Sequence, residues 1–150
     1  MAFANRGGYV FGVCNGFQVL TETGLLPGAL LRNAGLKYIC KHVKLNVETT
    51  QSAYTSAYKA DQSITIPIAH HDGNYNLDDA DAQALFDQDR VAFTYADNPN
   101  GSVRSIAGVL SENRRVLGMM PHPERLADPA QGGTDGQPFF AGLMDQIAKV

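Results

Sequence analysis

A single cysteine, placed where an apolar run gives way to an amphipathic one, constrains this chain more than any other feature. Residues 9–13 form a short apolar run, which predicts a buried strand. Cys14 follows at once, and residues 15–23 carry apolar side chains at helical spacing, with Gly24 as a stop signal. The sequence therefore predicts a strand-to-helix turn with a cysteine at its bend.

This turn has the form of a nucleophile elbow, in which a sharp bend pushes a reactive side chain out of the sheet. Gly12 and Gly16 stand two residues to either side of Cys14, and they leave room for the bend and for a closely packed helix. The helix N-terminus favours a thiolate, and the backbone N–H of Asn15 would point toward a developing oxyanion. The alternative is a buried structural cysteine, because free cysteines are commonly buried.

A second pattern with chemical meaning follows the apolar run at residues 116–120. His122 stands between two prolines, which predict an extended backbone in which His122 and Glu124 face the same side. A carboxylate beside an imidazole fixes its tautomer and raises its basicity. Taken alone, the pair is more typical of a solvated surface, but together with Cys14 it predicts a Cys-His-Glu triad at the ends of strands.

The rest of the chain predicts more strands than helices, and we expect one mixed α/β domain over residues 1–150. Pro67 indicates an edge strand or the end of a strand, and residues 121–138 are expected to form a loop. The expected strands are residues 37–48, 63–69, 91–95, 106–110 and 116–120, and the expected further helices are residues 80–86 and 138–149.

Composition excludes several classes of protein. The 150 residues are 44% hydrophobic and 18% charged, as in soluble globular domains, and no apolar run approaches the ~20 residues of a membrane span. A net charge of -3 differs from the basic excess of nucleic-acid binders. The two cysteines predict no disulfide framework, and the first residues lack an export signal, so we expect a cytoplasmic protein.

Other side chains are candidate metal ligands or candidate pocket residues. Cys40 and His42 alternate along a predicted strand and could share a face, but two ligands are too few for a zinc site. His70 or His71 could line a pocket. We therefore expect no metal site in this chain.

Residues 12–18 resemble the nucleophile motif of class I glutamine amidotransferases, and residues 121–124 resemble their His-Pro-Glu motif. Within that class, further segments resemble the PurQ-type glutaminase subunits of phosphoribosylformylglycinamidine synthase: residues 25–29, 31–33, 66–70, 100–102, 106–108 and 118–125. The resemblance extends over residues 7–149. It implies a flavodoxin-like, three-layer α/β fold for the domain at residues 1–150.

The resemblance also implies a role for each motif residue. Cys14 would attack the side-chain amide carbon of glutamine and form a glutamyl thioester, which water would hydrolyse. His122 would move the protons, and Glu124 would orient His122. Gln18 matches a position near bound glutamine, and the Asn15 N–H would contact the oxyanion.

The implied partner is the large synthetase subunit of phosphoribosylformylglycinamidine synthase, which would receive the ammonia in de novo purine biosynthesis; a small accessory subunit could join them. ATP and Mg²⁺ would be used by that partner, and the resemblance implies no cofactor in this chain. Neither nucleic acid nor membrane is an expected partner.

The chain departs from the family pattern at two places. Family members begin well before the equivalent of Tyr9, with roughly two βα units of ~30 residues each and a Pro-Gly-Gly loop that supplies the second oxyanion N–H. We therefore expect an N-terminally truncated domain, weakly stable and poorly active alone, since one lost oxyanion donor costs on the order of 10²–10³ in rate. Residues 70–73 also differ from the family's His-Gly-Glu-Gly.

Two alternatives to an active glutaminase stay open at this point. The chain could be a catalytically inert docking subunit or fragment of the same synthase. It could also be a triad amidotransferase that feeds another acceptor.

Overall fold

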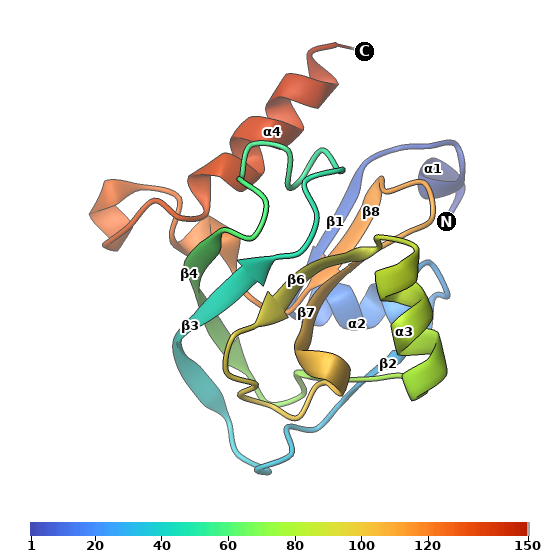
Figure 1. The fold of residues 1–150 in the computed structure, drawn as a ribbon, viewed down its shortest axis with the longest axis vertical. Helices are drawn as coiled ribbons and strands as arrows, with labels where there is room; N and C mark the ends of the chain where they lie inside the picture. The colour runs from blue at the N-terminus through green and yellow to red at the C-terminus, as the bar shows by residue number, and fades with distance from the viewer. Residues whose placement is uncertain (150) are drawn as a thin grey trace.

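The computed structural model describes residues 1–149, which fold around a six-stranded sheet with the strand order β1-β8-β7-β6-β3-β4 (Figure 1). Strands β1 and β8 run parallel, and the other neighbouring pairs are antiparallel. The strands of this sheet are β1 (Val10–Val13), β3 (Ile39–Val47), β4 (Ser63–His70), β6 (Val91–Tyr95), β7 (Ile106–Leu110) and β8 (Val116–Met119).

Short elements and helices complete the described chain. Strands β2 (Ala29–Leu31) and β5 (Asn74–Asn76) form a separate antiparallel pair. The helices are α1 (Ala2–Asn5), α2 (Asn15–Glu22), α3 (Asp79–Asp87) and α4 (Gln137–Ile147), with 3₁₀ turns η1 (Val103–Ser105), η2 (Pro123–Arg125) and η3 (Pro129–Gln131).

The sheet has a hydrophobic core on each face, which gives the three layers that the sequence predicts. On one face, α2 and α3 pack through Phe17 and Leu85 against strand residues such as Val109. On the other face, α4 packs through Phe139, whose ring centroid lies 5.4 Å from that of Tyr54. Alternate residues of β7 and β8 belong to opposite cores, as strand geometry requires.

The sheet curls, and this curl positions the candidate site. Strands β1 and β4 are the two edges of the sheet, yet Cys14 Sγ at the end of β1 lies 3.6 Å from the carbonyl oxygen of Ala69 in β4. The backbone N–H of His122, which follows β8, donates to the carbonyl of Pro67 in β4 at 2.8 Å. The ends of three strands therefore meet in one place.

Every strand and helix predicted above is present, and Pro67 does lie in an edge strand. The sequence missed α1, β2, β5 and the 3₁₀ turns, two of which lie in the expected loop. The short strands are fixed by distant packing: Tyr75 of β5 is fully buried, and its ring stacks on Phe17 at 5.3 Å. Such contacts leave no periodic signal in a three-residue segment.

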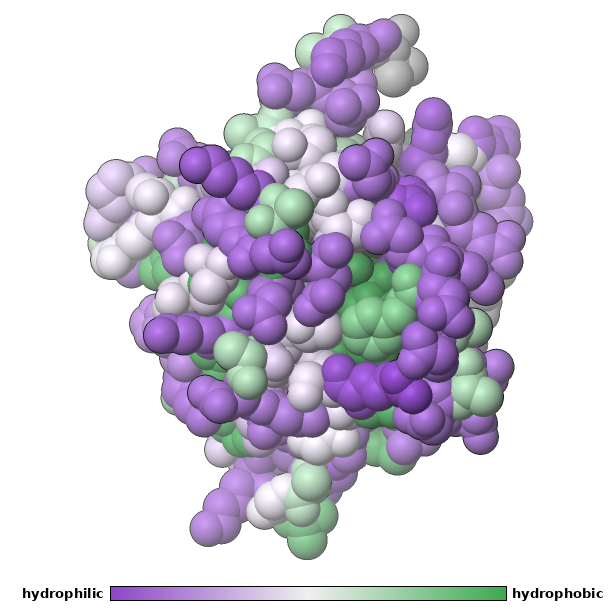
Figure 2. Space-filling model, viewed as in Figure 1, coloured by the Kyte–Doolittle hydropathy of each residue, from purple (hydrophilic) through white to green (hydrophobic). Residues whose placement is uncertain are grey.

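Hydrophilic residues predominate on the face seen in Figure 2, and hydrophobic ones gather in a smaller area near its middle. Among residues 1–149, no helix has both the length and the apolar character that a membrane span needs.

Candidate active site

Cys14 occupies the bend between β1 and α2, as predicted. It is the N-cap of α2, and its backbone has φ 54° and ψ -111°, a region that side-chain-bearing residues rarely adopt. Its N–H donates to the carbonyl of Met119 at 2.8 Å, and its carbonyl accepts from the N–H of Phe17 at 3.0 Å. Strained backbone of this kind costs of order 1–3 kcal/mol and persists only when its surroundings hold it.

The two glycines of the bend are not equivalent. A Cβ on Gly12 would lie 2.6 Å from the backbone oxygen of Gly16 and 2.6 Å from Leu20 Cδ1, so a glycine at position 12 lets α2 start close against β1. A Cβ on Gly16 would meet nothing within 4 Å. The close packing of α2 against β1 therefore requires glycine at position 12, as predicted, but it does not require glycine at position 16.

His122 and Glu124 lie together, as the motif predicts. The imidazole Nδ1 is 2.6 Å from Glu124 Oε1, and His122 is 5% exposed. The extended backbone predicted for this motif is wrong, because the chain turns into the 3₁₀ helix η2 at Pro123. The two side chains still meet because a single tight turn keeps residues two apart within reach.

Opposing effects set the charge of this pair. Burial disfavours the imidazolium, but interactions with Cys14 and Glu124 outweigh it and raise the pKa of His122 to about 9. Partial burial raises the pKa of Glu124, but the hydrogen bond to His122 and the charge of His122 lower it by more. The pKa of Glu124 therefore lies below its ordinary value. Among the described residues, the buried Nε2 of His122 has no hydrogen-bond partner.

Cys14 is thus close enough to affect His122, although the thiol is directed at Ala69 and not bonded to Nε2. A pocket of about 250 Å³ opens beside the thiol. Its lining includes the sequence-predicted residues Cys14, Asn15, Gln18, His70 and His71, together with Tyr38, Ala69, Asp72 and Met120. The side-chain amide of Gln18 donates to Glu22 along α2 at 2.8 Å.

Sequence reasoning missed part of this pocket. Ala69 contacts the thiol of Cys14 through its backbone carbonyl, and a backbone contact cannot be predicted from the type of residue. Asn33 was noted only as part of a family segment, yet it is fully buried and bonded to His70. A buried asparagine after a short strand could have been flagged, because buried polar side chains need several partners.

Cys40 and His42, the two side chains considered as metal ligands, lie apart from the pocket lining. Cys40 and His42 are both exposed, and within residues 1–149 no group of three or more His, Cys, Asp or Glu side chains could hold a metal ion.

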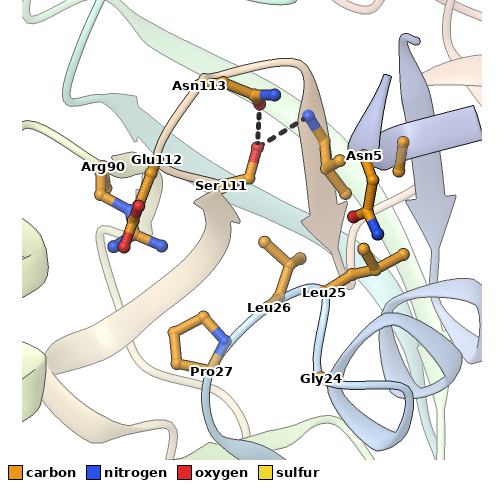
Figure 3. A pocket seen from close by; sticks show the side chains of 11 residues that line it. Asn5, Gly24, Leu25, Leu26, Pro27, Arg90, Ser111, Glu112 and Asn113 are labelled. Carbon is orange, nitrogen blue, oxygen red and sulfur yellow. Dashed lines mark hydrogen bonds between the residues drawn. The ribbon is translucent and has the colours of Figure 1, made fainter. Parts of the chain in front are cut away.

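A larger hollow of about 710 Å³ lies at the other end of β8, where Val116 begins the strand (Figure 3). Its lining includes Arg90, whose Nε donates to the carbonyl of Leu110 at 3.0 Å and whose Nη1 donates to Gln88 at 3.0 Å. Ser111 accepts from the N–H of Val116 and bonds Asn113, as Figure 3 shows. Arg90 and Ser111 are engaged in these bonds, and the lining contains neither a cysteine nor a histidine, so the smaller pocket at Cys14 is the candidate active site.

Comparison with known proteins shows the family to which the chain belongs. Residues 1–136 match the family model of the CobB/CobQ-like glutamine amidotransferase domain. The chain is 71% identical over 143 residues to the phosphoribosylformylglycinamidine synthase subunit PurQ of Ruegeria sp. (strain TM1040), which covers 95% of this chain and 64% of the relative. It is 68% identical over 149 residues to the PurQ subunit of Roseobacter denitrificans, covering 99% of this chain and 67% of the relative.

Solved structures give the same result. The structure of PurLQS from Thermotoga maritima superposes with a TM-score of 0.88 at 42% identity, over 97% of this chain and 65% of that one. The glutaminase domain of Trypanosoma brucei CTPS shares the fold alone, with a TM-score of 0.55 at 15% identity, over 90% of this chain and 60% of that one. The chain thus spans about two thirds of the length of the relatives it matches most fully. It belongs to the CobB/CobQ-like glutamine amidotransferase family, and within that family to the PurQ type.

Proposed function

We propose that this chain hydrolyses glutamine at Cys14 and supplies the ammonia to phosphoribosylformylglycinamidine synthase in purine biosynthesis. The observation that carries the proposal is the placement of Cys14, on strained backbone at the end of β1, beside buried His122 and its more exposed partner Glu124. The relatives named above are PurQ subunits of that synthase.

The chemistry would proceed in two steps. Cys14 Sγ attacks the carboxamide carbon of glutamine while its proton goes to Nε2 of His122, the imidazole atom that is free of other partners. The tetrahedral oxyanion accepts a hydrogen bond from the N–H of Asn15, and His122 returns the proton to the leaving nitrogen. Water then adds to the thioester carbon and gives a proton to Nε2 of His122, the C–S bond breaks, the sulfur takes up that proton, and glutamate leaves.

Glu124 would act by orientation. Its carboxylate accepts from Nδ1–H of His122, which leaves Nε2 as the atom that exchanges protons with substrate. The raised pKa of His122 favours the imidazolium that forms when Nε2 takes the thiol proton, and this imidazolium then protonates the departing nitrogen.

The ammonia would pass to a large synthetase subunit. The matching Thermotoga maritima structure is described as PurLQS, an assembly in which a PurQ chain has PurL and PurS as companions. In this proposal the partner uses ATP and Mg²⁺, and this chain contributes amide hydrolysis without a cofactor.

Replacement of the nucleophile tests the proposal in the assembled complex. With Cys14→Ala, synthesis driven by glutamine should be abolished, while synthesis driven by added ammonia should be unchanged. Cys40→Ala is the matched control, because Cys40 is exposed on β3 and both activities should persist. Glutamine-driven synthesis by Cys14→Ala would refute the assignment of the nucleophile. A wild-type complex that uses only ammonia would instead identify a docking subunit without glutaminase activity.

A further inference from the structure

His70 forms part of the wall of the pocket at Cys14, and the mechanism above gives it no role. It ends β4, directly after Ala69, whose carbonyl faces the thiol of Cys14. The side chain is 4% exposed. Its ring lies against Gly73, where a Cβ would come within 2.2 Å of Cε1.

Asn33 fixes the tautomer of this imidazole. The Nδ2 of Asn33 donates to the carbonyls of Lys37 at 2.8 Å and His70 at 2.9 Å, so its Oδ1 is the atom turned toward the ring. That oxygen accepts from the N–H of Gly73 at 3.0 Å and lies 3.0 Å from Nδ1 of His70. Since Oδ1 can only accept, Nδ1 must carry the proton, and Nε2 is left as a bare acceptor.

This acceptor has no partner. Among the described residues, Nε2 of His70 is one of three buried side-chain nitrogen or oxygen atoms without a hydrogen bond. Burial lowers the pKa of His70 to about 4, so the ring stays neutral and keeps its lone pair at physiological pH. A buried acceptor without a donor is unfavourable, and in a pocket wall it indicates that a ligand brings the donor.

Glutamine offers N–H donors at two ends, its α-ammonium and its carboxamide. The carboxamide must reach Cys14, and it is therefore the end that lies beside Ala69 and His70. The exposed carboxylate of Asp72, also in the pocket lining and 3.5 Å from Nε of Arg32, is the better match for the α-ammonium.

We propose that Nε2 of His70 accepts a hydrogen bond from the carboxamide nitrogen of glutamine and then from the ammonia released there. This inference rests on the proposed function. His70 transfers no proton: the proton on the leaving nitrogen comes from His122, and the neutral ring of His70 holds NH₃ without converting it to ammonium. The bond strengthens as the nitrogen gains its proton, so it favours the transition state over bound substrate.

Two substitutions test the roles of the two ring nitrogens of His70 separately. His70→Asn keeps an N–H near the Nδ1 position for Asn33 but removes the acceptor at the Nε2 position. His70→Gln places its amide group near the Nε2 position and is the matched control. In the complex with the synthetase, His70→Asn should lower kcat for glutamine at least about tenfold with little change in KM, and His70→Gln should lose less.

The substrate itself provides the decisive comparison. Glutamate γ-methyl ester has no N–H on its leaving group, so the loss caused by His70→Asn should be much smaller for the ester than for glutamine. An equal loss on both substrates would mean a structural role, and an unchanged kcat for glutamine would mean no contact; either result overturns the inference.

A third variant distinguishes the loss of this contact from a loss of stability. If His70→Asn melts at a much lower temperature than wild type, Gly73→Ala displaces the ring without removing it and should show the same preference for the ester. If the wild-type complex hydrolyses neither substrate, the proposed function fails as a whole; if it hydrolyses both and the variants show no amide-specific loss, only the role of His70 fails.

Discussion

Two buried histidines near Cys14 are driven toward opposite charge states. Burial opposes the imidazolium in both, yet the pKa of His122 rises to about 9 and that of His70 falls to about 4. The difference lies in their neighbours: Cys14 and the carboxylate of Glu124 raise the pKa of His122, whereas Nδ1 of His70 bonds the neutral amide of Asn33. One pocket can therefore hold a proton donor and a neutral acceptor at the same pH.

Glu124→Gln should lower the pKa of His122, because it removes the carboxylate charge while burial still disfavours the imidazolium. The pKa would be followed by NMR titration of the ring protons. The folded-state pKa lies above the ordinary 6.5, so the stability gained from the pair is fully present below pH 6.5 and is lost as pH rises toward about 9. The difference in unfolding free energy between wild type and variant should therefore be larger at pH 6.5 than above pH 9. An unchanged pKa in the variant would mean that Glu124 is not the cause.

The elbow between β1 and α2 depends on one of its two glycines. Gly12→Ala should destabilise the protein by about 1–3 kcal/mol, because the atom in its way is the backbone oxygen of Gly16, which cannot move aside cheaply. Gly16→Ala is the control: it meets open space and should be neutral or stabilising by up to ~1 kcal/mol in a helix. Denaturant unfolding of both variants measures this. A smaller loss for Gly12→Ala than for Gly16→Ala would contradict the packing described here.

At the level of elements, the sequence predicts what local pattern controls. The apolar run before Cys14 and the helical spacing of apolar residues after Pro138 can be recognised in the sequence. The contact between His122 and Glu124, two residues apart, can also be predicted from it. The curl of the sheet is not visible, because it arises from side chains that pack across both faces. The wall formed by Ala69 and His70 opposite Cys14 depends on that curl, and the family resemblance did not supply it.

The whole molecule has an open strand edge at β1. The N–H groups of Val10 and Cys14 donate toward the carbonyls of Arg115 and Met119 in and beside β8, so Phe11 and Val13 face the other way. Among residues 1–149, no strand pairs on that side. Unpaired edges invite another strand.

Amide exchange should reveal this edge. In hydrogen exchange followed by NMR, the amides of Phe11 and Val13 should exchange faster than those of Gly12 and Cys14, because only the N–H groups of Gly12 and Cys14 point toward β8. Equally slow exchange at all four positions would mean that the edge is covered in solution, as by a strand from a companion chain.

The parallel pairing of β1 with β8 also has a consequence in time. Cys14 is made before β8 and the His122–Glu124 pair, which follow it in the chain by more than 100 residues. At about 5–20 residues per second, a ribosome would need on the order of 5–20 s to close that gap. A chain still being synthesised would therefore carry the thiol without the His122–Glu124 pair, and the proposed chemistry would become possible only after residue 124 has been made and has folded into place.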